Sequence, residues 1–172
     1  MTATDRPAID VQIACDDTDI PSADEISAWV ERALADAGRN IEPGTELSVR
    51  VVDKEDMRAL NRDYRQKDKA TNVLSFPAGP LVGLPADMPE PLGDIVVCAA
   101  VVSDEAVAQG KTLLAHWAHM LVHGTLHLLG YDHETETQAA DMEALERKIL
   151  THHGLTDPYG ASHQRTDRIS GS

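Results

Sequence analysis

The sequence contains little of what several protein classes require. Aromatic residues make up 3% of its 172 residues, and its two cysteines form no C-x-x-C pair. The longest purely apolar run, 95–102, is far shorter than the ~18 residues that a transmembrane helix needs. Residues 1–10 carry acids and a proline where a secretory signal has a basic and then an apolar region. We therefore expect a cytoplasmic protein with reduced structural thiols at Cys15 and Cys98.

Basic residues are also scarce. Fifteen bases stand against 29 acids, so the formal net charge is −14, and the chain as a whole repels nucleic acids and anionic membranes. The segment 58–69 is an exception, because it holds five bases and two acids and leaves ten bases and 27 acids elsewhere. A positive segment in such an acidic chain can contact a phosphate, although a solvated helix face would show the same pattern.

The composition and the order of the patterns indicate the fold class. Apolar residues make up 42% and charged residues 26%, as in ordinary globular domains. Apolar patterns predict strands at 9–13, 47–52, 73–76 and 93–98, and helices after Ser22, after Asp53, and over 103–109, 111–129 and 134–152. We expect an α+β fold: a single domain over 1–156 with a small mixed β-sheet and about five helices. The polar segment 157–172 is predicted to be a disordered tail.

The histidines indicate where the chemistry lies. All eight fall between residues 116 and 163, and the segment 123–133 reads H-G-T-L-H-L-L-G-Y-D-H. His123 and His127 lie on one face of the predicted long helix because they are four residues apart. Gly130 is expected to end that helix, so that the turn after it can bring His133 back toward the pair. Three neutral imidazoles leave a fourth position open, as in catalytic zinc sites.

The other histidines leave alternatives open. His119 continues the row of His123 and His127, so it could replace His133 as a ligand or hydrogen-bond a ligand. His116 is expected to pack or face solvent, and the surface is expected for His152, His153 and His163. Peptidases with the H-E-x-x-H motif carry their general base where this chain has Gly124, which argues against a peptidase.

Several segments together resemble the YbeY family, bacterial metal-dependent endoribonucleases of ribosomal RNA maturation. Residues 123–133 follow the family pattern H-G-x-L-H-L-x-G-Y-D-H throughout. Residues 60–76, L-N-R-D-Y-R-Q-K-D-K-A-T-N-V-L-S-F, resemble the family segment L-N-x-x-Y-R-x-K-D-x-x-T-N-V-L-S-F. The G-D-I of 93–95 and the M-E-A-L-E of 142–146 also fit. The likeness spans roughly residues 45–160.

The resemblance assigns roles to particular residues. It implies one Zn²⁺ per chain in a cleft, held by His123, His127 and His133. It makes Arg65 the active-site arginine, whose planar guanidinium suits two phosphate oxygens. Three other cations within residues 60–76 are further candidates for substrate binding, because they could contact RNA phosphates whatever the base sequence: Arg62, Lys67 and Lys69.

The implied function is cleavage of single-stranded RNA in ribosomal RNA processing, including maturation of the 16S rRNA 3′ end, and in ribosome quality control. The implied partners are single-stranded ribosomal RNA and the ribosome or its small-subunit proteins, with no membrane. Because the body of the chain is acidic, we expect weak non-specific RNA binding and a need for a partner that brings the substrate.

Two other functions stay open. One is a different zinc hydrolase, a peptidase or amidase, and the other is a non-catalytic ribosome-assembly factor whose zinc stiffens the fold. The sequence shows no evident general base, and Asp132 is a weak candidate. The aromatic residues nearest to the motifs are expected in the core rather than as stacking partners for bases: Tyr64, Phe76 and Tyr131.

Overall fold

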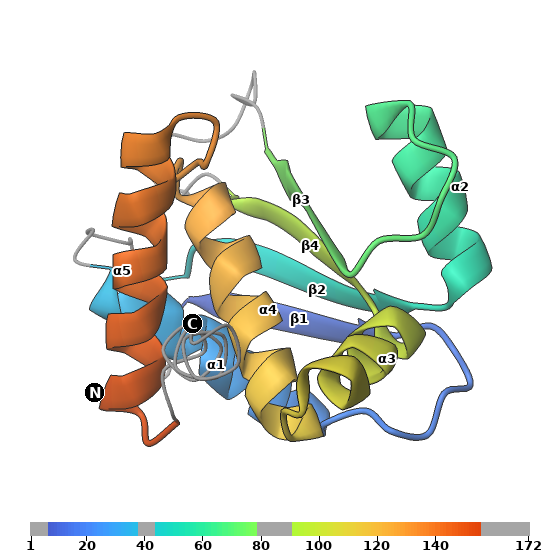
Figure 1. The fold of residues 1–172 in the computed structure, drawn as a ribbon, viewed down its shortest axis with the longest axis horizontal. Coiled ribbons are helices and arrows are strands. Elements are labelled where there is room, and N and C mark those ends of the chain that lie inside the picture. Colours follow the sequence, from blue (N-terminus) through green and yellow to red (C-terminus); the bar gives the residue numbers. More distant parts are fainter. Residues whose placement is uncertain (1–6, 38–43, 79–90, 156–172) are drawn as a thin grey trace, which may run out of the picture.

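The computed structural model describes residues 7–37, 44–78 and 91–155, whose helices and strands are labelled in chain order in Figure 1. Their bounds are β1 Ala8–Ile13, α1 Ala23–Asp36, β2 Glu46–Val52, α2 Lys54–Arg65, β3 Val73–Pro77, β4 Gly93–Cys98, α3 Ala99–Gln109, α4 Leu113–Leu128 and α5 Glu136–His152. Most of the proline-rich segment between β3 and β4, the predicted tail and His163 lie outside the described residues.

The four strands form one mixed sheet in the order β1-β2-β4-β3. β1 pairs in parallel with β2, and β2 pairs in parallel with β4, whereas β3 runs antiparallel to β4. The prediction of an α+β domain with a small mixed sheet and five helices is confirmed. Because β3 is an edge strand, the outer side of its backbone is not paired with another described strand.

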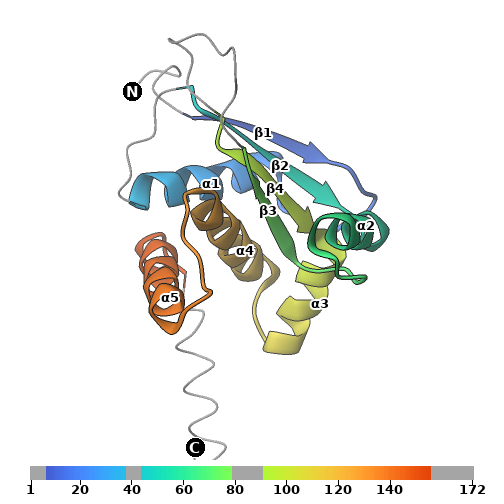
Figure 2. The ribbon, with the colours of Figure 1, turned by 90° about the horizontal axis from the view of Figure 1, so that it is seen from above.

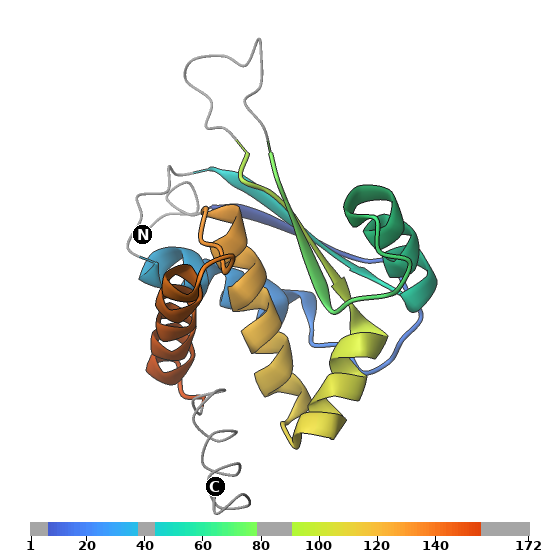
Figure 3. The same ribbon diagram turned by 45° about the horizontal axis from the view of Figure 1, so that its top comes forward.

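The helices divide unevenly between the two faces of the sheet. Figure 2 shows α1, α4 and α5 on one side, and Figure 3 shows α4 between α5 and the sheet. Ile95 and Val97 of β4 belong to the large core formed with these helices, whereas Val96 and Cys98 pack into a smaller core with Met57 of α2. β4 is therefore buried on both faces, as its nearly continuous apolar sequence predicts.

Most helix starts follow from their capping residues. Ser22 accepts a hydrogen bond from the Glu25 backbone, and the Glu25 carboxylate accepts one in return, which is a capping box. α3 differs from the prediction, because it begins at Ala99, directly after β4, and not at Ser103. The apolar run 95–102 is thus shared between a strand and a helix, and periodicity does not reveal that division in so short a run.

Two of the expectations drawn from composition can be compared with the structure. None of the described helices combines the length and the apolarity needed to cross a bilayer. Cys15 and Cys98 are both free thiols, as expected, and burial raises the pKa of each.

α4 approaches the sheet closely at Gly124. A Cβ atom added there would lie 3.0 Å from Ile95 Cγ2 and 3.3 Å from Val73 Cγ2. Ser75 Oγ also donates a 2.9 Å hydrogen bond to the Gly124 carbonyl oxygen. Gly124 stands where the H-E-x-x-H motif of peptidases has its glutamate. This position faces β3 and β4, and a large side chain fits there only if these neighbouring side chains move.

We predict that Gly124→Val lowers the free energy of unfolding by about 1–3 kcal/mol, because the added methyl groups overpack the contact between α4 and the sheet. Urea unfolding measures the loss. Leu114→Val is the matched control, since it places the same β-branched side chain at an exposed position of α4. Equal losses in the two variants would contradict the close packing at Gly124.

Candidate metal centre and phosphate site

The end of α4 turns the chain back toward the helix. The Tyr131 N–H donates to the Leu126 carbonyl, and the Gly130 N–H donates to the His127 carbonyl, both at 3.0 Å. This pair of bonds is a Schellman motif, and Gly130 takes the positive φ of 100° that the motif requires. The Asp132 carboxylate then accepts a 2.7 Å hydrogen bond from the His133 N–H, which fixes the turn that carries this histidine.

Three histidines meet where the turn comes back. One ring nitrogen from each of His123, His127 and His133 lies within 4.8 Å of the others. The Nε2 atoms of His123 and His127 are 3.2 Å apart. Two imidazoles on one tetrahedral zinc ion place their nitrogens about 3.4 Å apart, since Zn–N bonds are about 2.0–2.1 Å long. The donor set and its spacing therefore fit a zinc-sized ion.

A buried glutamate on α5 orients the first of these histidines. Glu146 is fully buried, and its Oε2 accepts a 2.6 Å hydrogen bond from His123 Nδ1. Because a carboxylate only accepts, Nδ1 carries the ring proton and leaves the Nε2 lone pair facing His127. Burial alone would raise the pKa of Glu146, but hydrogen bonds with His119 and His123 outweigh it and lower that pKa to about 2.

The second histidine is held in its neutral form. Burial, followed by the charges that His123 and His133 carry when protonated, lowers the pKa of His127 to about 4. A neutral imidazole keeps a lone pair for a metal, so the ring is ready to ligate at neutral pH.

The structure separates the remaining helix histidines from the cluster. His119 lies beyond Glu146, with its Nε2 3.4 Å from Glu146 Oε1, so it contacts the carboxylate rather than replacing His133. His116 is buried and its Nε2 is 2.9 Å from Glu105 Oε1. Sequence reasoning assigned no role to Glu146; its signal is an acid within the apolar stripe of α5, which Met142 and Ile149 otherwise form.

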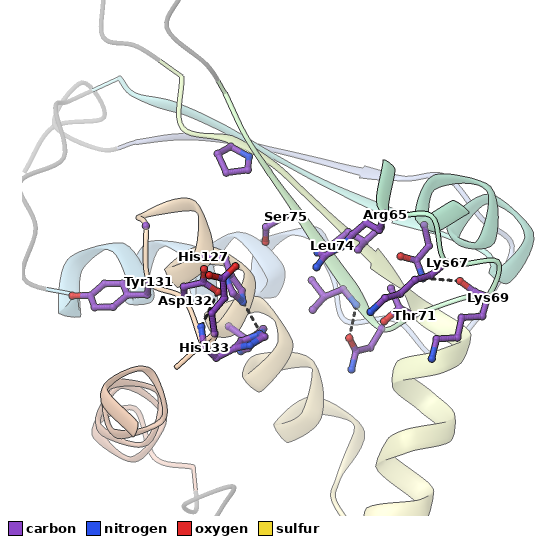
Figure 4. A pocket seen from close by; sticks show the side chains of 17 residues that line it. Arg65, Lys67, Lys69, Thr71, Leu74, Ser75, His127, Tyr131, Asp132 and His133 are labelled. Atoms are coloured by element: carbon purple, nitrogen blue, oxygen red, sulfur yellow. Dashed lines mark hydrogen bonds between the residues drawn. The ribbon is translucent and has the colours of Figure 1, made fainter. Parts of the chain in front are cut away.

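The histidine cluster opens into a cavity of about 570 Å³ that basic side chains also line. Arg65, Lys67 and Lys69 line it together with the three histidines. Figure 4 shows His127 and His133 on one side of Leu74 and Ser75 of β3. The basic side chains lie on the other side: Arg65, Lys67 and Lys69.

Ion pairs explain why only part of the basic segment lines this cavity. The Arg58 guanidinium contacts both carboxylate oxygens of Asp68, at 2.8 and 3.0 Å. Arg62 Nε is 3.3 Å from Asp63 Oδ1, and Arg62 is not among the cavity-lining residues. Arg65, Lys67 and Lys69 form no ion pair with any described acid. The substrate roles of all four residues, Arg62 included, stay predictions.

The aromatic residues differ partly from expectation. The Tyr64 residue is 65% exposed and packs edge-on against Phe76, with ring centroids 5.3 Å apart, so its prediction as a core residue is wrong. Tyr131 is half-buried and lines the cavity. The carboxylates that line the same cavity are Asp132 and Glu134, and the former already accepts a bond within its own turn.

Comparison with known proteins places this geometry in a family. The model of the family described as "Endoribonuclease YbeY" matches residues 11–154. The chain belongs to the YbeY family. A YbeY relative from Halorhodospira halophila is 58% identical over 139 residues, which are 81% of this chain and 88% of that protein. Another, from Alcanivorax borkumensis, is 47% identical over 167 residues, or 96% and 94% of the two chains.

Both YbeY relatives carry the name "Endoribonuclease YbeY". A solution structure of a Thermotoga maritima protein is 21% identical, covers 83% of this chain and 90% of its own, and superimposes with a TM-score of 0.48. The YbeY-family match runs from within β1 to the end of α5 and so includes the elements that supply the histidine cluster and the basic residues of the cavity.

We predict that Glu146→Gln lowers the affinity for Zn²⁺ about 10–100-fold, because the amide no longer supplies an ionised acceptor for His123. Competition with a chromophoric chelator measures the change. Glu143→Gln, one turn earlier on α5, is the matched control. If both variants bind Zn²⁺ as wild type does, the orienting role of Glu146 is wrong.

Proposed function

We propose that this protein is a zinc-dependent endoribonuclease that cleaves single-stranded RNA in the cytoplasm and takes part in ribosomal RNA maturation. One observation carries the proposal: His123, His127 and His133 line the same cavity as Arg65, Lys67 and Lys69. The name "Endoribonuclease YbeY" of relatives at 47% and 58% identity supports it independently. The domain that we assign to this activity is 1–156.

The three histidines are the residues that would hold one zinc ion. A zinc ion on three neutral imidazoles supplies a Lewis acid with one open position. The chain contributes the geometry for it: the α4 spacing sets His123 beside His127, and the Gly130 turn returns His133. Glu146 then fixes which nitrogen of His123 faces the cluster.

Arg65 is the residue we assign to the scissile phosphate. Its guanidinium can donate to two phosphate oxygens at once and neutralise their charge. The side chain comes from the last residue of α2, where the helix dipole presents its negative end. The backbone there does not attract an anion, so the positive charge has to come from side chains, and Lys67 and Lys69 extend it along the cavity.

The charge of the whole chain supports a substrate that a partner delivers. The segment 58–69 has a charge of +3, because it holds five bases and two acids. The remaining residues then carry ten bases and 27 acids, or −17. An RNA strand is attracted at the cavity and repelled by the rest of the surface, which weakens binding of free RNA. We infer that the ribosome or a small-subunit protein holds the RNA near the cavity.

We predict that Arg65→Ala lowers the rate of cleavage of a single-stranded RNA about 100-fold, because one charge-stabilising group is lost. Zinc content, measured by elemental analysis, should stay as in wild type. Arg58→Ala is the matched control, since this arginine of the same helix is paired with Asp68 and does not line the cavity.

Full cleavage by Arg65→Ala would contradict the role of this arginine. Zinc bound at one equivalent by wild type, with no cleavage of any RNA, would contradict the proposed activity and favour an assembly factor. Peptide and amide substrates are tested beside RNA, and cleavage of one of them without cleavage of RNA would identify a different zinc hydrolase.

The lysines have a distinct signature. We predict that Lys67→Ala and Lys69→Ala each weaken the binding of single-stranded RNA, and by the same factor whatever the RNA sequence. Each substitution should also reduce the magnitude of the slope of log affinity against log salt concentration by about 0.7. Fluorescence anisotropy at several salt concentrations measures the slope. Lys148→Ala on α5 is the control, and Arg62→Ala tests the remaining predicted contact in the same series. A slope unchanged in both lysine variants excludes them from the RNA contact.

A further inference from the structure

A second group of metal-ligating side chains lies outside the candidate metal centre. His152 Nδ1 and His153 Nε2 are each 2.8 Å from the same carboxylate oxygen, Oδ2 of Asp36. One ligand atom of each of the three residues lies within 4.8 Å of the others. The group thus joins side chains that are more than a hundred residues apart in the sequence.

The backbone around this group favours a cation. Asp36 is the last residue of α1 and His152 the last residue of α5, so two helix C-termini meet here. The final carbonyl groups of a helix carry partial negative charge, and this charge attracts cations within the last turn. Burial alone would raise the pKa of Asp36, but the hydrogen bonds from the two histidines outweigh it and lower that pKa.

The three side chains differ in their exposure to solvent. The His153 side chain is 23% exposed and its ring lies edge-on to Trp29, with centroids 6.0 Å apart. The Asp36 side chain is 19% exposed, whereas that of His152 is 66% exposed. Asp36 and His153 are therefore largely covered by protein, and a hydrated ion can approach from the side of the exposed His152.

We propose that Asp36, His152 and His153 form a second site for a divalent transition metal of the Zn²⁺ class. Two imidazole nitrogens and one carboxylate oxygen form a donor set that such ions prefer, and three protein ligands leave one position for water. Zinc would join the end of α1 to the end of α5. Each ring proton that now faces Asp36 moves to the other ring nitrogen or to solvent when the metal takes its place.

The test is a titration of the full-length protein, freed of metal, with Zn²⁺ alone. Ring resonances of the histidines, followed by NMR, report the two clusters separately. We expect the His152 and His153 signals to shift and saturate at submillimolar Zn²⁺. Asp36→Asn should weaken this second event about tenfold or more, while the response of His123, His127 and His133 stays as in wild type. Asp141→Asn, at an exposed position of α5, is the matched control.

A second variant and a count complete the design. His152→Ala removes the exposed ligand and leaves the packed ones, so it tests the site even if Asp36→Asn fails to fold. Elemental analysis should give one Zn²⁺ fewer per chain for this variant than for wild type. The proposal is overturned if His152 and His153 respond only at millimolar Zn²⁺, or if both variants bind as wild type does; the group is then a hydrogen-bonded link between two helices. Neither outcome depends on RNA cleavage.

Discussion

The hydrogen bond between the buried Glu146 carboxylate and His123 is the constraint on which the candidate metal centre depends. An ionised carboxylate without exposure to water is costly unless it is fully hydrogen-bonded, and here His119 and His123 supply its partners. Because Glu146 comes from α5 and both histidines from α4, the bonds form only when the two helices pack in one register. The orientation of the metal-facing nitrogen is therefore a product of the tertiary fold and not of the H-x-x-x-H spacing alone.

Local ion pairs resolve the apparent conflict between an acidic chain and an anionic substrate. Two arginines of α2 are paired with nearby acids: Arg58 with Asp68, and Arg62 with Asp63. Arg65, Lys67 and Lys69, which follow them in the chain, have no ion-pair partner among the described acids and line the cavity. The chain as a whole has a net charge of −14, whereas the cavity beside β3 is lined by three cations and by two acids, Asp132 and Glu134.

The parts of the site that the sequence predicts are those set by local geometry. Helical spacing placed His123 beside His127, and the glycine signal at Gly130 predicted the turn that returns His133; the structure has both. The role of Glu146 could not be predicted, since it depends on how α5 packs against α4 and brings Glu146 to His123, 23 residues earlier in the chain. Tyr64 was expected in the core, but its exposure depends on the tertiary structure: its ring meets Phe76 of β3 edge-on, and the residue is 65% exposed among the described residues.

α5 contributes to both histidine groups, but it supplies a carboxylate to one and two imidazoles to the other. Its middle contributes a buried carboxylate to the cluster on α4, and its end contributes His152 and His153 to the carboxylate of α1. The two groups bond to different residues of α5, so its middle is tied to α4 and its end to α1. The position of α5 is therefore fixed by two independent contacts, and the proposed second site can take up an ion while the hydrogen bond between His123 and Glu146 stays in place.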